Sequence, residues 1–143
     1  MKDDRINQIV ETLSQVMRLM KKEISFTDTL KHLSMLQIQT IIYLYNNANV
    51  SMGDIAGHFR VEMPSATSLL NKLFDQKLVE RRDDPTDRRV VKVSLTGEGK
   101  ILAKKAMAER RNHMKKMLSY LSVKEQSGLL EIMRSLQNRL QEE

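Results

Sequence analysis

A hairpin signal in the second half of the chain constrains the fold more than any other feature. Residues 83–99 read D-D-P-T-D-R-R-V-V-K-V-S-L-T-G-E-G. Apolar and polar residues alternate over 90–95 with the two-residue period of a strand, and residues 78–82 are also rich in strand-forming types. Residues 83–89 place Pro85 at the preferred second position of a turn. The sequence therefore predicts an antiparallel hairpin with its loop at 83–89.

The segment before the hairpin carries the end signals of two short helices. Ser51 followed by Asp54 is a capping-box pattern, and Pro64 suits the first turn of a second helix because its missing N–H would be unpaired there anyway. Residues 60–63 then form the turn between the helices. One face of the second helix is apolar at helical spacing, with Ala66, Leu69, Leu70, Leu73 and Phe74. Two helices joined by a turn of about four residues fit a helix-turn-helix over 51–76.

The opposite face of the second helix is mostly uncharged and polar. Beginning at Pro64, it presents Ser65, Ser68, Asn71, Lys72 and Asp75, flanked by Thr67. Ordinary solvated faces favour better helix formers than Ser and Thr, so we interpret this face as a surface that reads DNA. Asn71 suits a bidentate contact to adenine, and Lys72 suits guanine or phosphate. A capped helical hairpin with a plain solvated face is the alternative.

The hairpin loop ends on an arginine pair, Arg88 and Arg89. Beside a recognition helix, such a loop projects its guanidinium groups toward the adjacent minor groove, where narrow A·T-rich steps concentrate negative potential. Asp87 is close enough in sequence to orient one guanidinium through a fork-like pair. The alternative is a hydrated loop tip without a partner.

Long amphipathic helices are predicted on both sides of this region. Apolar residues recur at helical spacing from Ile6 to Ile24. Thr96 caps a helix that is predicted to end at Tyr120, and Ser122 caps a last helix through a capping box with Glu125. The stripe of this last helix is made by Leu129, Ile132, Met133, Leu136 and Leu140.

The composition excludes several classes of protein. The 143 residues, 41% of them apolar, fit one domain with a hydrophobic core. There is no apolar run that could span a bilayer, and the charged start lacks the apolar stretch of a signal peptide, so we expect a cytoplasmic protein without a membrane partner. The absence of cysteine excludes disulfides, thiolate metal sites and cysteine-based redox sensing. The net charge of +6 favours a polyanionic partner.

Signals for metals, cofactors and catalysis are weak. The histidines are scattered at His32, His58 and His113. Glu109 and His113 share a helix face at i, i+4, which leaves a zinc-responsive regulator open as an alternative. Gly97 and Gly99 lack the flanking pattern of a nucleotide fingerprint and are interpreted as turn residues before a helix. With no Ser/His/Asp or paired-carboxylate arrangement, we predict no enzyme, no cofactor and no metal site.

The run D-P-T-D-R-R-V-V-K-V-S-L-T-G-E-G, residues 84–99, resembles the wing signature of the multiple antibiotic resistance regulator (MarR) family. The upstream segments D-I-A and P-S-A-T-S-L-L-N-K-L resemble its helix-turn-helix. The resemblance implies a winged-helix dimer in which Arg89, with Asp87 two residues before it, enters the minor groove. It also implies a crevice for small, often aromatic, ligands that alter DNA affinity. One departure is Lys77, where many relatives have a glycine that ends the helix in a left-handed conformation.

These expectations define one domain, mainly α with a small β wing. A winged-helix DNA-binding lobe occupies 34–96 and opens with a capping box at Ser34 and Gln37, while dimerisation helices occupy 1–32 and 97–143. A lobe of this size is too small to cover the apolar stripes of the first and last helices. We therefore expect a second copy of the chain, related by a two-fold axis, to bury them. That axis places two recognition helices about 34 Å apart on an imperfect palindrome.

The function expected is that of a homodimeric transcriptional regulator that binds double-stranded DNA in a sequence-specific manner. The simplest version is a repressor whose operator affinity is altered by a small aromatic or lipophilic ligand. A winged-helix adaptor that docks a protein partner and lacks sequence-specific DNA binding is the alternative. Nonspecific binding to DNA separates the two.

Overall fold

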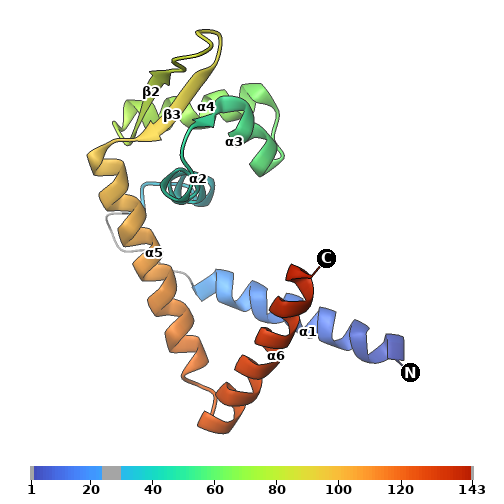
Figure 1. Ribbon diagram of the computed structural model, residues 1–143. Coiled ribbons are helices and arrows are strands. Elements are labelled where there is room, and N and C mark those ends of the chain that lie inside the picture. The colour runs from blue at the N-terminus through green and yellow to red at the C-terminus, as the bar shows by residue number, and fades with distance from the viewer. Residues whose placement is uncertain (1, 24–29, 143) are drawn as a thin grey trace. The chain divides into compact units, whose positions relative to one another are not determined.

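The computed structural model describes residues 2–23 and 30–142. The chain divides into two compact units, residues 1–108 and 109–143. Figure 1 shows a chain that is mainly helical with one small sheet, as the sequence predicts. In chain order the elements are α1 (Lys2–Glu23), α2 (Met35–Asn46), β1 (Val50–Ser51), α3 (Met52–Phe59), α4 (Met63–Asp75), β2 (Val79–Asp83), β3 (Val91–Leu95), α5 (Gly97–Leu118) and α6 (Val123–Gln141).

Three of these helices begin with a complete capping box, and all three boxes are predicted from the sequence. At α2, the Ser34 N–H donates to Oε1 of Gln37 at 2.7 Å, and the Gln37 N–H donates to Oγ of Ser34 at 3.2 Å. Each box satisfies backbone donors that a helix start leaves without an intrahelical acceptor. The same reciprocal pattern occurs at Ser51 with Asp54 before α3 and at Ser122 with Glu125 before α6.

The predicted hairpin is confirmed, with strand bounds that differ by about one residue. Strands β2 and β3 are antiparallel, with Val79 opposite Leu95 and Asp83 opposite Val91. The short strand β1 pairs with the other edge of β3 through Val50 and Val93, which gives the order β1-β3-β2. Strand β1 is not predictable from the sequence, because a two-residue strand has no periodicity to detect.

The core of the first unit lies between the sheet and helices α2, α3 and α4. Leu30, Ile41 and Leu70 have no exposed surface. The start of α5 joins this core through Leu102, Ala103 and Ala106, so the helix that leaves the wing is anchored to the lobe. The core cluster also contains Leu33, Ile38, Leu44, Val50, Ile55, Leu73, Leu78, Val79, Val93 and Leu95.

Helix α5 starts as predicted and ends slightly earlier than predicted. The Gly99 N–H donates to Oγ1 of Thr96 at 3.1 Å, which confirms the cap. The helix ends at Leu118 rather than at Tyr120, because the Tyr120 N–H bonds to the Met117 carbonyl three residues back and leaves the α-helical pattern.

Helices α1 and α6 expose their apolar stripes. The described side chains of α6 include none that is buried, and those of α1 are exposed from residue 3 to residue 19. Ile24, the last member of the predicted first stripe, lies outside the described residues. The large exposed apolar side chains are Ile6, Ile9, Val10, Leu13, Val16, Met17 and Leu19 in α1, and Val123, Leu129, Leu130, Ile132, Met133, Leu136 and Leu140 in α6. Over the described ranges, no helix is both long and apolar enough to cross a bilayer.

Candidate nucleic-acid interface

The connection between α3 and α4 is one residue shorter than predicted. Arg60 takes a left-handed conformation with φ of 52°, and the Val61 N–H donates to the Ala56 carbonyl at 3.0 Å, which closes the end of α3. Glu62 is the N-cap residue of α4, and Pro64 lies in the first turn as predicted. The turn therefore covers 60–62 rather than 60–63, because Met63 already has helical geometry.

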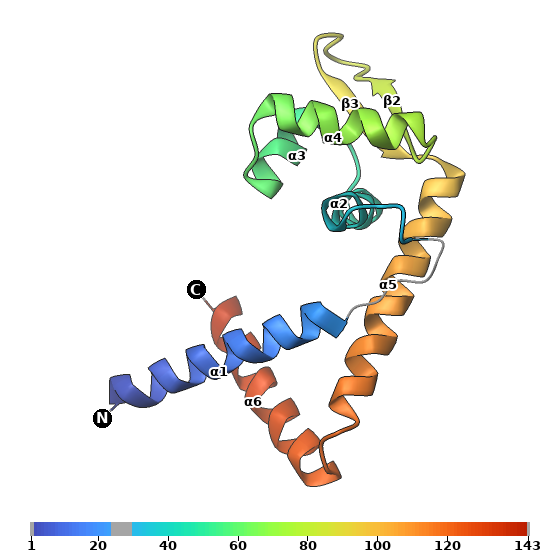
Figure 2. The same cartoon turned by 180° about the vertical axis from the view of Figure 1, so that it is seen from behind.

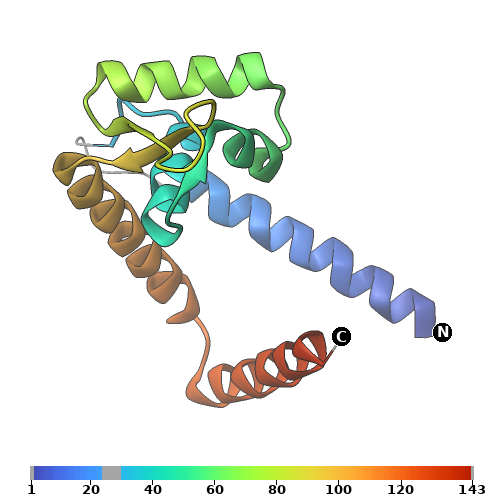
Figure 3. The same ribbon diagram turned by 45° about the horizontal axis from the view of Figure 1, so that its top comes forward.

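Helix α4 separates an apolar face from a polar face, as its sequence predicts. Ala66, Leu69, Leu70 and Leu73 are buried. Figure 3 shows α4 along one outer edge of the lobe, with the turn to α3 at one end. The predicted site residues Pro64, Ser65, Ser68, Asn71 and Lys72 are exposed, and Thr67 is half-buried. In the part of the chain that the structure describes, Ser65 and Ser68 bond to no other group through their hydroxyls, so both are available to a ligand.

Arg81 of β2 contacts two residues of α4, a role that the sequence analysis missed. Its Nη2 donates to Oδ1 of Asn71 at 3.3 Å, and its guanidinium carbon lies 4.7 Å from the centroid of the Phe74 ring. In Figures 1 and 2, β2 and α4 lie side by side. With its carbonyl oxygen held by Arg81, Asn71 has its amide nitrogen free to donate outward. A bidentate contact to adenine would use this nitrogen together with the second lone pair of the same oxygen.

The wing, residues 79–95, owes its loop conformation to Asp84. Oδ1 of Asp84 accepts the backbone N–H groups of Thr86 at 2.8 Å and of Asp87 at 3.1 Å, and it also accepts the Thr86 hydroxyl. The Thr86 hydroxyl and these two N–H groups hold the pKa of the Asp84 carboxyl below its ordinary value, because all of them stabilise the charged form. The loop is therefore organised by a carboxylate that stays ionised at neutral pH.

Asp87 orients the backbone of Arg89 rather than a guanidinium group. Its Oδ1 accepts the Arg89 N–H at 2.9 Å, and its carbonyl accepts the Val90 N–H at 3.0 Å. Within residues 30–142, no ion pair joins Asp87 to Arg88 or Arg89, so the predicted fork-like pair is wrong. The short side chain of an aspartate in a turn readily accepts the backbone N–H two residues further along the chain. This local bond competes with a pair to a long arginine side chain that points into solvent. The two guanidinium groups are exposed at the loop.

The root of the wing has a second ion pair, which is more exposed. Arg82 donates through Nη2 to Oε1 of Glu80 at 2.8 Å, and both side chains are largely in solvent. The Arg82 hydrogen bond and charge lower the pKa of the Glu80 carboxyl. Because exposed pairs contribute little to stability, this pair mainly neutralises one of the wing's positive charges.

The candidate metal ligands do not come together. His58 stacks on Tyr43 with ring centroids 4.0 Å apart, and His32 is exposed. His113 has an Nε2 atom that is buried and without a hydrogen-bond partner. No set of three or more His, Asp or Glu side chains suited to a metal ion occurs among the described residues, so Glu109 and His113 lack a third protein ligand there.

Comparison with known proteins shows what the lobe resembles. Residues 33–91, which contain α2 to the start of β3, match the model of the MarR family. Over this segment the chain is similar to the MarR family. It is 25% identical over 108 residues to the HTH-type transcriptional regulator YdgJ of Bacillus subtilis, and the match covers 76% of this chain and 66% of YdgJ. It is 29% identical over 89 residues to the repressor MdtR of the same organism, covering 62% of this chain and 57% of MdtR.

The fold agrees with solved MarR-family structures. A mutant of Staphylococcus aureus MepR, bound to an oligodeoxyribonucleotide, aligns with a TM-score of 0.66 and 22% identity, covering 92% of this chain and 97% of that one. At this identity the likeness establishes the fold. The curated relatives are named as transcriptional regulators, a class of DNA-binding proteins that are not enzymes.

The MarR-family departure at Lys77 does not break the helix end. Lys77 itself takes the left-handed conformation, with φ of 57°. The Leu78 N–H donates to the Leu73 carbonyl at 3.0 Å, and the Lys77 N–H donates to the Phe74 carbonyl at 2.9 Å, which is the bond pattern of a Schellman motif. A lysine therefore occupies a position where glycine has no steric cost.

Proposed function

We propose that the protein is a transcriptional regulator that binds double-stranded DNA in a sequence-specific manner through α4 and the wing. The observation that carries the proposal is the combination, in one lobe, of an exposed polar face on α4 with a hairpin whose loop exposes two guanidinium groups. A major groove admits a helix of this kind, and the adjacent minor groove attracts arginine.

The proposed contacts divide between specificity and anchoring. The hydroxyls of Ser65, Thr67 and Ser68 and the amide of Asn71 would contact base edges, with Pro64 at the exposed start of the same face. Lys72 would contact guanine or phosphate. Arg88 and Arg89 would enter the minor groove, where they read its width more than its base sequence. Asp87 would act through the backbone of Arg89.

We propose a homodimer in which the stripes of α1 and α6 pack against a second copy of the chain. Each stripe exposes several large apolar side chains, more than a soluble protein usually leaves uncovered. Two-fold symmetry would present two recognition helices about one turn of B-form DNA apart, so the operator would be an imperfect palindrome. Repression would follow if this site overlaps a promoter, and the relative MdtR is named as a repressor. A cytoplasmic location agrees with a DNA ligand.

A small aromatic or lipophilic effector would alter DNA affinity only by favouring one spacing of the recognition helices over another. The size of its effect equals its differential affinity for the two spacings. Operator complexes that keep their affinity through titration with a panel of phenolic compounds would remove this part of the proposal.

Selection of bound duplexes from a random pool tests the DNA-binding proposal. The expected product is an imperfect palindrome with half-sites about 10 base pairs apart. With Asn71→Ala, the preference should relax at one position in each half-site, whereas Gln39→Ala, an exposed amide on α2, should leave it unchanged. Failure of the protein to bind any duplex at low ionic strength would favour the protein-interaction adaptor.

A further inference from the structure

A chain of polar contacts links the segment before the helix-turn-helix to the tip of the wing. It starts at the backbone carbonyl of Asn49, which precedes β1, and passes through Lys92 of β3 to Asp84 at the start of the wing loop. Through the Asp84 carboxylate it reaches Asp87, whose own carboxylate holds the N–H of Arg89. Four links therefore connect Asn49 to the arginine that is proposed to enter the minor groove.

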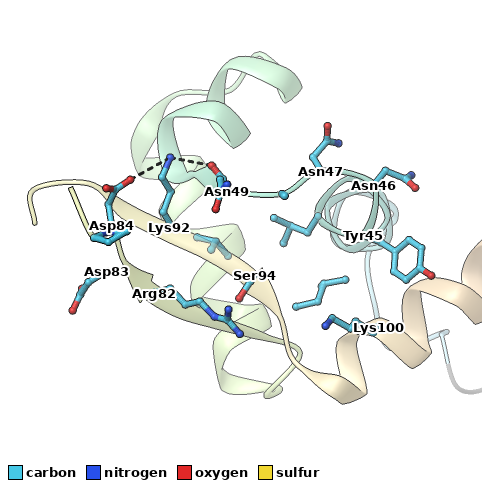
Figure 4. Close-up of a pocket in the computed structure, with 15 residues that line it drawn as sticks. Tyr45, Asn46, Asn47, Asn49, Arg82, Asp83, Asp84, Lys92, Ser94 and Lys100 are labelled. Carbon is cyan, nitrogen blue, oxygen red and sulfur yellow. Dashed lines mark hydrogen bonds and ion pairs between the residues drawn. The ribbon is translucent and has the colours of Figure 1, made fainter. Parts of the chain in front are cut away.

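Lys92 is the long-range member of this chain. Its Nζ donates to the Asn49 carbonyl at 2.9 Å and lies 3.8 Å from Oδ2 of Asp84. Figure 4 shows its side chain crossing from β3 toward both partners, beside a hollow of about 640 Å³. Asn49 is separated from Lys92 by 43 positions and has a left-handed backbone with φ of 54°. The ammonium group thus joins two turns that are far apart in the sequence.

Burial distinguishes this link from the other charge pair of the wing. The side chains of Lys92 and Asp84 retain 24% and 18% of their exposure, whereas those of Arg82 and Glu80 retain 67% and 44%. Partly buried charges are screened less by salt and are held in a narrower range of positions than exposed ones. The ion pair of Lys92 with Asp84 is therefore suited to hold the wing loop in one position, whereas the more exposed pair of Arg82 with Glu80 is not.

Lys92 also has a fixed backbone. It lies in the central strand, opposite Arg82 of β2 and opposite Ser51 of β1. Ser51 is also the N-cap residue of α3, so the backbone at Lys92 is tied to the first helix of the helix-turn-helix. The carboxylates near the ammonium group are those of Asp84 and Asp54. A side chain based in this strand can transmit the position of the helices to the loop.

We propose that Lys92 is a positioning residue for DNA binding: through Asn49 and Asp84 it fixes the wing loop, and with it Arg89, relative to the helix-turn-helix. This inference rests on the proposed function, because it assigns Lys92 a role in delivering Arg89 to the minor groove. Lys92 itself makes no contact with DNA in this scheme. Loss of the ammonium group would let the loop sample other positions and would raise the cost of placing Arg89.

A double-mutant cycle between Lys92→Met and Arg89→Ala tests the proposal. Methionine keeps most of the stem and removes the ammonium group. On the selected duplex at fixed salt, Lys92→Met should weaken binding about tenfold when Arg89 is present, and less than about twofold in the Arg89→Ala background. An equal loss in both backgrounds would overturn the proposal, since Lys92 would then act independently of Arg89, for example on a phosphate. Unchanged binding by Lys92→Met would overturn it as well.

Arg82→Met is the matched control. It removes the same charge from the residue directly opposite Lys92, which also lines the hollow of Figure 4, but it leaves the link to Asn49 intact. It should weaken binding less than about twofold and equally in both backgrounds. A coupling to Arg89 as large as that of Lys92 would contradict a specific role for Lys92, since general wing charge would explain both.

Two further measurements separate this inference from stability and from the proposed function. Thermal unfolding identifies the temperature range in which each variant is folded, and binding is compared there. If Lys92→Met does not fold, Asp84→Asn, which removes the charge but keeps an oxygen acceptor for the loop, replaces it in the same cycle with the same expected coupling. Wild-type protein that binds no duplex overturns the function and this inference together, whereas an Arg89 effect without coupling overturns this inference alone.

Discussion

Gly99 lies so close to Leu78 that a Cβ atom on the glycine would be 2.0 Å from the Leu78 carbonyl oxygen. The same carbonyl accepts the Thr96 N–H at 3.1 Å. Leu78 precedes β2, and Gly99 is in the first turn of α5. The close contact therefore lies at the point where the chain passes from β3 into α5. No side chain larger than hydrogen fits there without a shift of the backbone.

Gly99→Ala should destabilise the lobe by about 1–3 kcal/mol or more, because the backbone must move to accept the methyl group. Away from such a contact, alanine would be the better helix former. Gly97→Ala is the control, since its φ is not positive and, in the described part of the chain, no group beyond its own neighbours lies within 4 Å of where a methyl would stand. Urea unfolding followed by circular dichroism measures both, and equal stability of the two variants would contradict the close approach.

Lys77→Gly should stabilise the protein by about 0.5–1 kcal/mol, because glycine adopts the left-handed conformation of this position without a Cβ clash. Gln76→Gly, one residue earlier at φ of −82°, gains no such relief and should destabilise instead. The difference between the two unfolding free energies is the quantity to measure. A loss of stability with Lys77→Gly would show that the lysine side chain stabilises the fold by more than the left-handed backbone conformation of Lys77 destabilises it.

Asp54 should make the unfolding free energy of the lobe depend on pH in the acidic range. The Ser51 N–H and hydroxyl donate to its carboxylate and lower its pKa below the ordinary value of 3.8. A carboxyl with a lowered folded-state pKa stabilises the fold above its unfolded-state pKa, and this contribution is lost as pH falls through the folded value. Between about pH 5 and pH 2, Asp54→Asn should flatten the fall in urea midpoint. An unchanged slope would count against the capping carboxylate.

Leu136→Glu should shift the protein from dimer to monomer, because it places a charge in the exposed stripe of α6 that we propose is buried between two copies. Asn138→Glu adds the same charge to a different, exposed face of the same helix and should leave the dimer intact. Sedimentation velocity over a range of concentrations distinguishes the two. A monomeric wild-type protein would remove the proposed interface.

Local features of this fold are predictable from the sequence, and long-range features are not. The capping box at Ser51 needs only a partner three residues away, and the hairpin needs only alternation and a turn. The contact of Lys92 with Asn49 spans 43 positions and leaves no pattern in either segment. Gly97 and Gly99 were interpreted as turn residues before a helix, but both lie within α5, where the role of Gly99 depends on the backbone at Leu78.

The candidate site shows the same division. The exposure of Ser65, Ser68 and Asn71 follows from helical periodicity and is confirmed, while their contacts with DNA stay predictions. Arg81 was missed because its hydrogen bond to Asn71 depends on how β2 packs beside α4. The error at Asp87 has the same origin, since the sequence places a carboxylate near two arginines but does not show that it bonds to the backbone.

Binding of wild-type protein and of Arg89→Ala to the selected duplex, compared by fluorescence anisotropy at one salt concentration, tests the central claim most directly. We predict that the substitution weakens binding by about 1–3 kcal/mol and leaves the unfolding midpoint unchanged, because the side chain is exposed in the free protein. Equal affinity of the two proteins would contradict the claim that the wing delivers a guanidinium group to DNA.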